Sequence, residues 1–164
     1  MLAMAMFVSY KIATLNINGL ATKPRIAMLE DVLHKQEIDI FLREVTRPVF
    51  DDIRGFVAHT NLRTSGRGTA ILTYDHIQLT NIVCLPTWRG MAAVFENVTL
   101  VNIYAPSGAE RRKEREHFFP GELPYLPRDI PSLLVGGDFN SVLTDMDATG
   151  QQNYSRALQE VIRG

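Results

Sequence analysis

Residues 7–19 read FVSYKIATLNING, an apolar and β-branched run that ends in the dipeptide Asn18-Gly19. Such a run predicts a β-strand, and Asn-Gly is a strong signal for a tight turn after it. In residues 24–36, apolar side chains recur at steps of three and four, which predicts a helix with Pro24 in its first turn. Residues 38–42 then form a short apolar run that is typical of a buried strand. This strand-helix-strand opening predicts an α/β fold in which the two strands lie side by side.

The middle of the chain has a different pattern, because strand-like runs follow one another with almost no helix between them. These runs are residues 56–60, 69–74, 77–85, 90–95 and 99–104. A turn at Glu96-Asn97 joins the last two, so we expect a hairpin there and an antiparallel meander. The sequence then predicts a helix at 109–119 stopped by Pro120-Gly121, a strand at 132–135 and an amphipathic helix at 153–163. With no repeat and no long linker, residues 1–164 are predicted to form one α/β sandwich domain.

The composition excludes several classes of protein. With 164 residues, 46% of them hydrophobic and 21% charged, the chain is an ordinary globular domain rather than a disordered one. Its single cysteine, Cys84, excludes an intrachain disulfide. Residues 1–8 are apolar but too short for a membrane span or a signal peptide, so we expect a nuclear or cytoplasmic protein with no membrane partner. The net charge of -1 means that any contact with nucleic acid must be local.

Two basic clusters are candidates for such a local contact. The first is formed by Arg63 and Arg67 in the Gly/Ser/Thr-rich segment 63–69. The second lies in residues 111–115, where basic residues alternate with glutamates. That alternation is typical of a solvated helix face, so Arg63 and Arg67 are the better candidates.

Four short segments at the predicted ends of strands carry oxygen or amide groups: residues 16–19, 44–46, 104–106 and 136–140. Each has an ordinary alternative, such as a turn at Asn18-Gly19, a solvated acid at Glu44, an interface aromatic at Tyr104 or an Asx-type turn at Asp138. Taken together, they supply what hydrolysis of a phosphodiester requires: carboxylates for a hard cation, donors for the phosphate and a group that activates water.

The chemistry of the side chains suggests a role for each. Glu44 is the natural ligand for magnesium, and Asn16 is placed to hold that carboxylate. Asp138 can orient or deprotonate water, and Asn140 can hold water or phosphate without adding negative charge. Tyr104 can donate its hydroxyl to a phosphate oxygen.

The order of NINGL (16–20), LREVT (42–46), GTAIL (68–72), NIYAP (102–106) and GGDFNSVL (136–143) resembles the endonuclease/exonuclease/phosphatase superfamily. More narrowly, it resembles the apurinic-type endonuclease domain of non-LTR retrotransposons, which nicks target DNA so that a reverse transcriptase can prime on it. The resemblance implies a four-layer α/β sandwich of the exonuclease III / deoxyribonuclease I type. It also implies DNA as the partner and Mg²⁺ as the cofactor, with Mn²⁺ as a substitute.

The resemblance also assigns residues by position. The family's metal-ligand glutamate falls on Glu44, its first-strand asparagine on Asn16, its active-site tyrosine on Tyr104, and its GDxN pair on Asp138 and Asn140. Contacts to the nucleic acid are expected from Asn18, Arg63 and Arg67. Phe139 and the NINGL segment favour the retrotransposon branch over abasic-site repair.

Two departures from the family pattern set further expectations. Arg43 replaces the usual glutamine before Glu44, and we expect this cation to compete with magnesium for the carboxylate charge. The family's closing Ser-Asp-His segment follows its last helix, whereas this sequence ends at Gly164, so the final strands are expected to be missing. None of the four histidines forms an Asp-His pair at a strand end. We therefore expect hydrolysis by this chain to be weak or absent.

Alternative functions stay open at this level. One is a catalytically dead relic that binds DNA or protein. Another is a phosphoesterase of the same superfamily that acts on a phosphoinositide or sphingolipid, although the sequence has no apolar docking loop and no polybasic cluster free of acids. The sequence predicts no oligomeric state.

Overall fold

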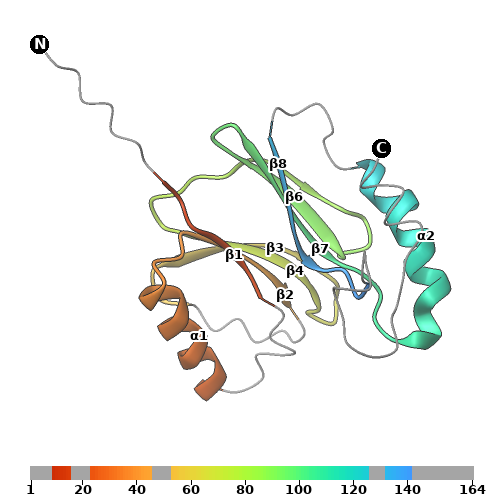
Figure 1. The fold of residues 1–164 in the computed structure, drawn as a ribbon, viewed down its shortest axis with the longest axis horizontal. Helices are drawn as coiled ribbons and strands as arrows, with labels where there is room; N and C mark the ends of the chain where they lie inside the picture. The colour runs from red at the N-terminus through yellow and green to blue at the C-terminus, as the bar shows by residue number, and fades with distance from the viewer. Residues whose placement is uncertain (1–8, 16–22, 46–52, 126–131, 142–164) are drawn as a thin grey trace, which may run out of the picture.

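The computed structural model describes residues 9–15, 23–45, 53–125 and 132–141, which form a sandwich of two mixed sheets with helices outside it (Figure 1). The strands are β1 (Ile12–Thr14), β2 (Ile40–Val45), β3 (Phe56–Leu62), β4 (Gly68–Tyr74), β5 (Thr80–Cys84), β6 (Gly90–Phe95), β7 (Val98–Tyr104) and β8 (Leu133–Asp138). The helices are α1 (Lys23–Lys35) and α2 (Arg112–Glu122), and short 3₁₀ helices, η1 (Ala109–Arg111) and η2 (Leu123–Tyr125), flank α2.

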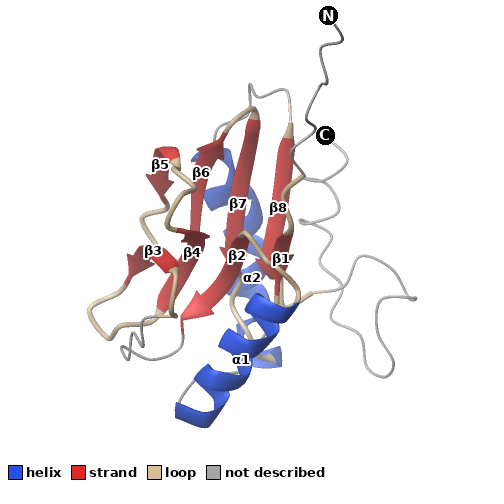
Figure 2. Cartoon of the chain, turned by 90° about the vertical axis from the view of Figure 1, so that its left-hand side faces the viewer, coloured by secondary structure: helices blue, strands red, loops and turns tan. Residues whose placement is uncertain are grey.

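Each sheet combines one parallel pair with antiparallel pairs. The first sheet has the order β1-β2-β4-β3 and the second the order β5-β6-β7-β8. β1 and β2 are parallel, as are β7 and β8, and the other neighbours are antiparallel. Figure 2 shows β1 and β8 on the same side of the sandwich, and the backbone of Gly136 in β8 lies close to the side chain of Thr14 in β1.

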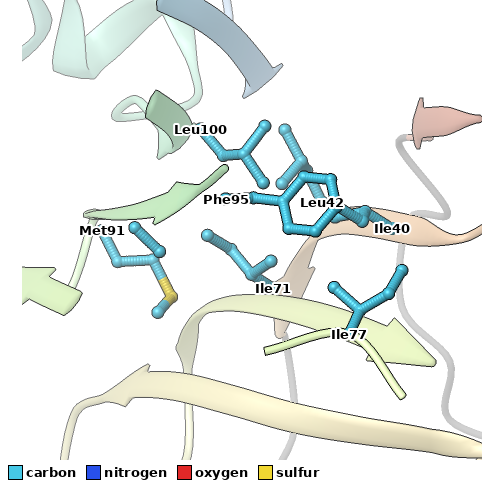
Figure 3. Packing of buried hydrophobic residues seen from close by; sticks show 8 residues of the cluster. Ile40, Leu42, Ile71, Ile77, Met91, Phe95 and Leu100 are labelled. Atoms are coloured by element: carbon cyan, nitrogen blue, oxygen red, sulfur yellow. The ribbon is translucent and has the colours of Figure 1, made fainter. Parts of the chain in front are cut away.

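An apolar core fills the space between the sheets. Ile40, Leu42 and Ile71 project into it from the first sheet, and Met91 and Leu100 project from the second (Figure 3). Because successive side chains of a strand point to opposite faces, the alternate residues of the same strands pack outward against helices. This alternation fixes the register of both sheets, since a shift by one residue would expose the core side chains.

Helices cover the outer faces of both sheets. α1 packs Leu29 and Leu33 against Phe41 of the first sheet. α2 packs Phe118 and Phe119 against residues of the second sheet. The result is a four-layer α/β/β/α sandwich, which Figure 1 shows with α1 and α2 on opposite sides. Of the helices in the described ranges, none combines the length and apolar character that crossing a membrane requires.

Most of the predicted elements are confirmed. The opening helix is α1, and the opening strand is β1, which has three residues and is shorter than the predicted run. The strand predicted at 38–42 is β2, which lies beside β1 as expected and pairs with it in parallel. The five runs of the middle are β3 to β7, and the Glu96-Asn97 hairpin joins β6 to β7. The NINGL segment and the helix predicted at 153–163 lie outside the described residues.

Three expectations about the middle and the second helix were wrong. The antiparallel strands do not form one meander, because the chain leaves the first sheet after β4 and begins the second with β5. The second helix does not stop at Pro120 but continues to Glu122, with Phe118 and Phe119 buried against the second sheet. Its basic cluster is not wholly solvated, since Arg115 is only 1% exposed.

Candidate active site

The predicted site residues that the structure describes come from both sheets. Tyr104 and Asp138 end β7 and β8 and are register partners in this parallel pair. Glu44 lies near the end of β2 in the first sheet, opposite Thr69 of β4. The Tyr104 hydroxyl is hydrogen-bonded to the Glu44 carboxylate. The site therefore bridges the two sheets at one edge of the sandwich.

Burial and a second carboxylate act on Glu44. Burial raises the pKa of the Glu44 carboxyl above its usual value. The hydrogen bond from Tyr104 lowers this pKa, whereas the negative charge of Asp138 raises it. Arg67 and Arg89 lie close enough for their positive charges to lower it as well, but the net shift is upward. A half-buried carboxylate that faces another acid is a group that a cation would stabilise.

Tyr104 is held as a hydrogen-bond donor. Burial raises the pKa of its hydroxyl, a hydrogen bond with Ser107 lowers it, and the Glu44 carboxylate raises it again. The net shift is upward, so the hydroxyl keeps its proton at neutral pH. The main chain that carries the ring is held by a hydrogen bond, since the Tyr104 N–H donates to the Arg89 carbonyl oxygen at 2.7 Å.

The turn after β8 is tied to the end of β7. The backbone N–H of Asn140 donates to Asp138 Oδ1 at 2.9 Å, which is the predicted Asx-type turn. Asn140 Nδ2 also donates to the Ala105 carbonyl oxygen at 2.8 Å, and the Ala105 N–H donates to the Asp138 carbonyl oxygen at 2.8 Å. Asn140 thus positions Asp138 beside Tyr104.

The second glycine of the GGD motif is required by this arrangement. Gly137 has a φ of 118°, a conformation that other residues rarely adopt, and a Cβ there would overlap the Ile103 carbonyl oxygen. The strand can therefore continue beside β7 up to Asp138 only with glycine at this position.

Arg43 was expected to lie beside the Glu44 carboxylate, but its side chain makes no hydrogen bond to that carboxylate. Adjacent residues of a strand point to opposite faces, so Glu44 follows Leu42 toward the second sheet, and Arg43 follows Phe41 toward the α1 side. Arg43 Nε donates to the main-chain oxygen of Glu44 at 3.3 Å, not to its carboxylate. Burial lowers the pKa of Arg43, and the negative charge of Glu44 acts in the opposite direction and raises it. The two charges therefore still interact through space.

Basic and aromatic side chains lie beside the two carboxylates. Arg67, from the β3–β4 hairpin, acts on Glu44 as described, and Arg63 of the same hairpin lies 5.9 Å from the ring of Trp88. Trp88 and Arg89 were not among the predicted site residues. The Arg89 guanidinium is 4.3 Å from the centre of the Trp88 ring and 5.4 Å from that of Tyr104. The Trp-Arg pair between two strands was the only signal, and it carries no periodicity that would have selected it.

The residues present fit a divalent cation of the magnesium type. Glu44 offers the carboxylate oxygens that Mg²⁺ and Mn²⁺ prefer, and the nearby negative charge of Asp138 adds to the attraction for a cation. Within the described ranges, no three His, Cys, Asp or Glu side chains cluster as a metal site. Mg²⁺ commonly takes one or two carboxylates and completes its shell with water and substrate phosphate, so two acids suffice. Asn16 and Asn18 lie outside the described residues.

Comparison with protein-family models finds no match for this chain, and neither does comparison with curated protein sequences. Solved structures do match. An AP endonuclease from Archaeoglobus fulgidus has a TM-score of 0.72 at 16% identity, over 94% of this chain and 69% of that one. The endonuclease domain of TRAS1, a telomere-specific non-LTR retrotransposon, has a TM-score of 0.60 at 18% identity, over 94% and 70%.

A third similar structure is TDP2 from D. rerio, complexed with a single-strand DNA product. Its TM-score is 0.63 at 18% identity, and the match covers 84% of this chain and 62% of that one. Together these likenesses confirm the predicted fold class, which is a layered α/β sandwich. At this level of identity the likeness establishes the fold, and the chemistry must be argued from the residues.

Proposed function

We propose that this chain hydrolyses phosphodiester bonds in DNA, as a magnesium-dependent endonuclease. The observation that carries the proposal is the convergence of Glu44 and Tyr104, which are hydrogen-bonded to each other across the two sheets, with Asp138. In support, two of the similar structures are endonucleases by name, and the third holds a DNA product.

Each residue has a role in this proposal. Glu44 would hold Mg²⁺, or Mn²⁺ in its place, and the bound ion would supply positive charge to stabilise the negative charge that develops on the phosphate. Asp138 accepts the proton of the attacking water, and Asn140 keeps its carboxylate in position. Tyr104 keeps Glu44 in place and donates to a phosphate oxygen when substrate is bound. Asn16 is proposed to hold the Glu44 carboxylate.

We expect hydrolysis to be slow, because the chain's histidines lie elsewhere. They are placed on α1 (His34), on β3 (His59), after β4 (His76) and on α2 (His117). Among the described groups that shift the pKa of Glu44 or Tyr104 there is no imidazole. A missing acid-base or charge-stabilising group typically lowers a rate by about 10²- to 10⁴-fold.

The finer assignment is to the retrotransposon type of endonuclease, which nicks DNA for a reverse transcriptase. It is supported by the NINGL segment, by Phe139 between Asp138 and Asn140, and by the likeness to the TRAS1 domain. We propose this type as the origin of the domain.

Nicking of supercoiled plasmid tests the proposal. Relaxed circles are expected with Mg²⁺ and not with EDTA, and Asp138→Ala should lower nicking by at least about 10²-fold. Asp75→Ala is the matched control. Asp75 is an exposed acid that follows the last residue of β4, whereas Thr69, the register partner of Glu44, lies near the start of that strand. Equal nicking by Asp138→Ala and the native chain would contradict the assignment of the site. Binding of DNA without any cleavage, by chain shown to be folded, would contradict the enzyme.

Thermal unfolding tests the metal site without relying on turnover. A ligand that binds only the folded state raises Tm, so Mg²⁺ is expected to stabilise the native chain. The Glu44→Gln variant should lose this response, and the Asp75→Ala control should keep it. The same Mg²⁺-dependent shift in Glu44→Gln would show that the ion binds elsewhere.

A further inference from the structure

Trp88, the single tryptophan of the chain, has an unusual backbone conformation. It lies in the β5–β6 turn with a φ of 59°, in the left-handed region that is unfavourable for a bulky side chain. The turn is held by hydrogen bonds from the Leu85 N–H to the Gly90 carbonyl (2.9 Å) and from the Trp88 N–H to the Leu85 carbonyl (3.2 Å). Thr69 Oγ1 lies 3.4 Å from the Trp88 carbonyl oxygen, as a donor to it. Such a conformation persists when the surroundings enforce it, and it is common where a side chain is displayed for function.

The ring of Trp88 is placed beside the candidate active site. Its centre is 6.2 Å from that of Tyr104, whose hydroxyl binds Glu44. Arg89 packs on the ring and is itself buried, with 5% of it exposed, and it donates to the Tyr104 carbonyl oxygen at 3.3 Å and to Glu114 at 3.4 Å. Trp88 is only half-buried, so part of this residue is accessible to solvent.

The charge around the ring suits a polyanion. Arg63 lies 5.9 Å from the ring centre and is exposed, and Arg67 of the same hairpin is exposed close to Glu44. An aromatic side chain with guanidinium groups around it is the usual surface for a nucleic-acid strand, because bases stack on the ring while phosphates pair with the cations.

We propose that Trp88 is a stacking platform for a nucleobase of the strand that is cut, with Arg63 and Arg67 on the neighbouring phosphates. A base inside a regular duplex is already stacked on both faces, so the preferred substrate is single-stranded or locally unpaired DNA. The inference rests on the proposed function for its substrate, but binding can be measured without cleavage. Loss of one stacked base is expected to weaken binding by about tenfold to a hundredfold.

Fluorescence of Trp88 gives a direct test, since no other tryptophan contributes to the signal. The full chain is titrated in EDTA with a short oligothymidine, with a duplex of the same length, and with a fully abasic strand of the same phosphate count. Saturable quenching is expected with the oligothymidine and little with the other two. Equal quenching by the abasic strand, or binding of oligothymidine without quenching, would overturn the platform.

Two substitutions complete the test, with a labelled oligothymidine followed by fluorescence anisotropy. Trp88→Leu should lose about tenfold or more in affinity, whereas Trp88→Phe keeps an aromatic face and should lose much less. Thermal unfolding first confirms that both variants are folded at the temperature of the binding assay. An equal loss of affinity in Trp88→Leu and Trp88→Phe would then indicate a purely structural role for Trp88 and overturn the proposal. Plasmid nicking separates the two ideas. If the native chain cleaves DNA and Trp88→Leu binds oligothymidine as tightly as the native chain, only the stacking proposal is contradicted. If Trp88→Leu binds more weakly but the native chain never cleaves, only the proposed endonuclease activity is contradicted.

Discussion

Glu44 shows at the scale of one residue how a site can oppose stability. Its pKa is raised in the folded chain by burial and by Asp138, so ionisation of Glu44 opposes folding. Between pH 4.5, the ordinary pKa of a glutamate, and the raised pKa of the folded chain, the folded state binds more protons than the unfolded state. The free energy of unfolding therefore falls as the pH rises through this range. Above it the loss is complete.

Glu44→Gln is therefore expected to raise Tm at neutral pH, by about 1–3 °C, while it abolishes hydrolysis. The gain should disappear below pH 4.5, where the native carboxyl is protonated as well. Thermal unfolding at several pH values measures this, with Glu110→Gln, an exposed acid, as the control. A lower Tm for Glu44→Gln at pH 7 would show that the carboxylate stabilises the fold.

Tyr104→Phe isolates one hydrogen bond at the same site. The ring and its contact with Trp88 remain, but the donor that lowers the Glu44 pKa is lost, so this pKa rises further. Hydrolysis needs ionised Glu44, and the acid limb of the pH–rate profile should move to higher pH. At neutral pH the rate should fall on the order of tenfold, as for one lost hydrogen bond to a charged group. An acid limb that stays in place would mean that Glu44 does not control it.

At the scale of the element, α2 holds the loop that follows β7. Arg115 is buried, and its Nη1 donates to the carbonyl oxygens of Pro106 (2.7 Å) and Gly108 (3.2 Å). These two carbonyls flank Ser107, the hydrogen-bond partner of Tyr104. A helix on the outer face of the second sheet thus orders a loop at the site.

Arg115→Met keeps the length of the side chain but leaves both carbonyls without this donor. We expect a loss of about 2–3 kcal/mol in the free energy of unfolding, measured with urea. Arg112→Met on the same helix is the matched control, since Arg112 is exposed and its removal should change stability by less than about 0.5 kcal/mol. Equal effects of the two substitutions would contradict the role of the buried guanidinium.

At the scale of the whole molecule, one buried amide ties the two sheets together beneath the site. Asn102 of β7 is fully buried, and its Nδ2 donates to the main-chain oxygens of Arg43 and Ala70, both at 2.8 Å. Those two residues are register partners in the pairing of β2 with β4. This link fixes the position of Glu44 relative to Tyr104 along the strands, because Glu44 directly follows Arg43 and Tyr104 is two residues after Asn102.

Asn102→Leu should lower the free energy of unfolding by about 2–4 kcal/mol, because two buried carbonyl oxygens lose a donor. Thr99→Val on the same strand is the contrast. In the described part of the chain, the buried Thr99 Oγ1 has no hydrogen-bond partner, so its replacement should be neutral or stabilising. Urea unfolding distinguishes the two, and a neutral Asn102→Leu would show that packing alone joins the sheets.

Local sequence signals predict the elements of this fold well, whereas contacts between distant residues are not visible in them. Strand and helix positions follow from apolar periodicity, and β6 begins and ends where the pattern placed it, at residues 90 and 95. The end of α2 was misplaced because burial of Phe118 and Phe119 against the second sheet outweighs the donor that Pro120 lacks. The charge pattern predicts a solvated Arg115 guanidinium, because such a pattern does not reveal which main-chain carbonyls surround the side chain in the folded chain.

Apolar periods of two and 3.6 residues predict the α/β class and the strand-helix-strand opening, and turn residues mark the polar groups that follow the strands, because these signals act over a few residues. The need for glycine at position 137 is different, because it depends on the close approach of β7 in the folded chain. Packing of the folded chain divides the strands into two sheets, brings Glu44 to Tyr104 and Asp138 across them, and turns Arg43 away. These contacts join strands that are far apart in the chain, so they are selected by the packing of both sheets and the helices around one core.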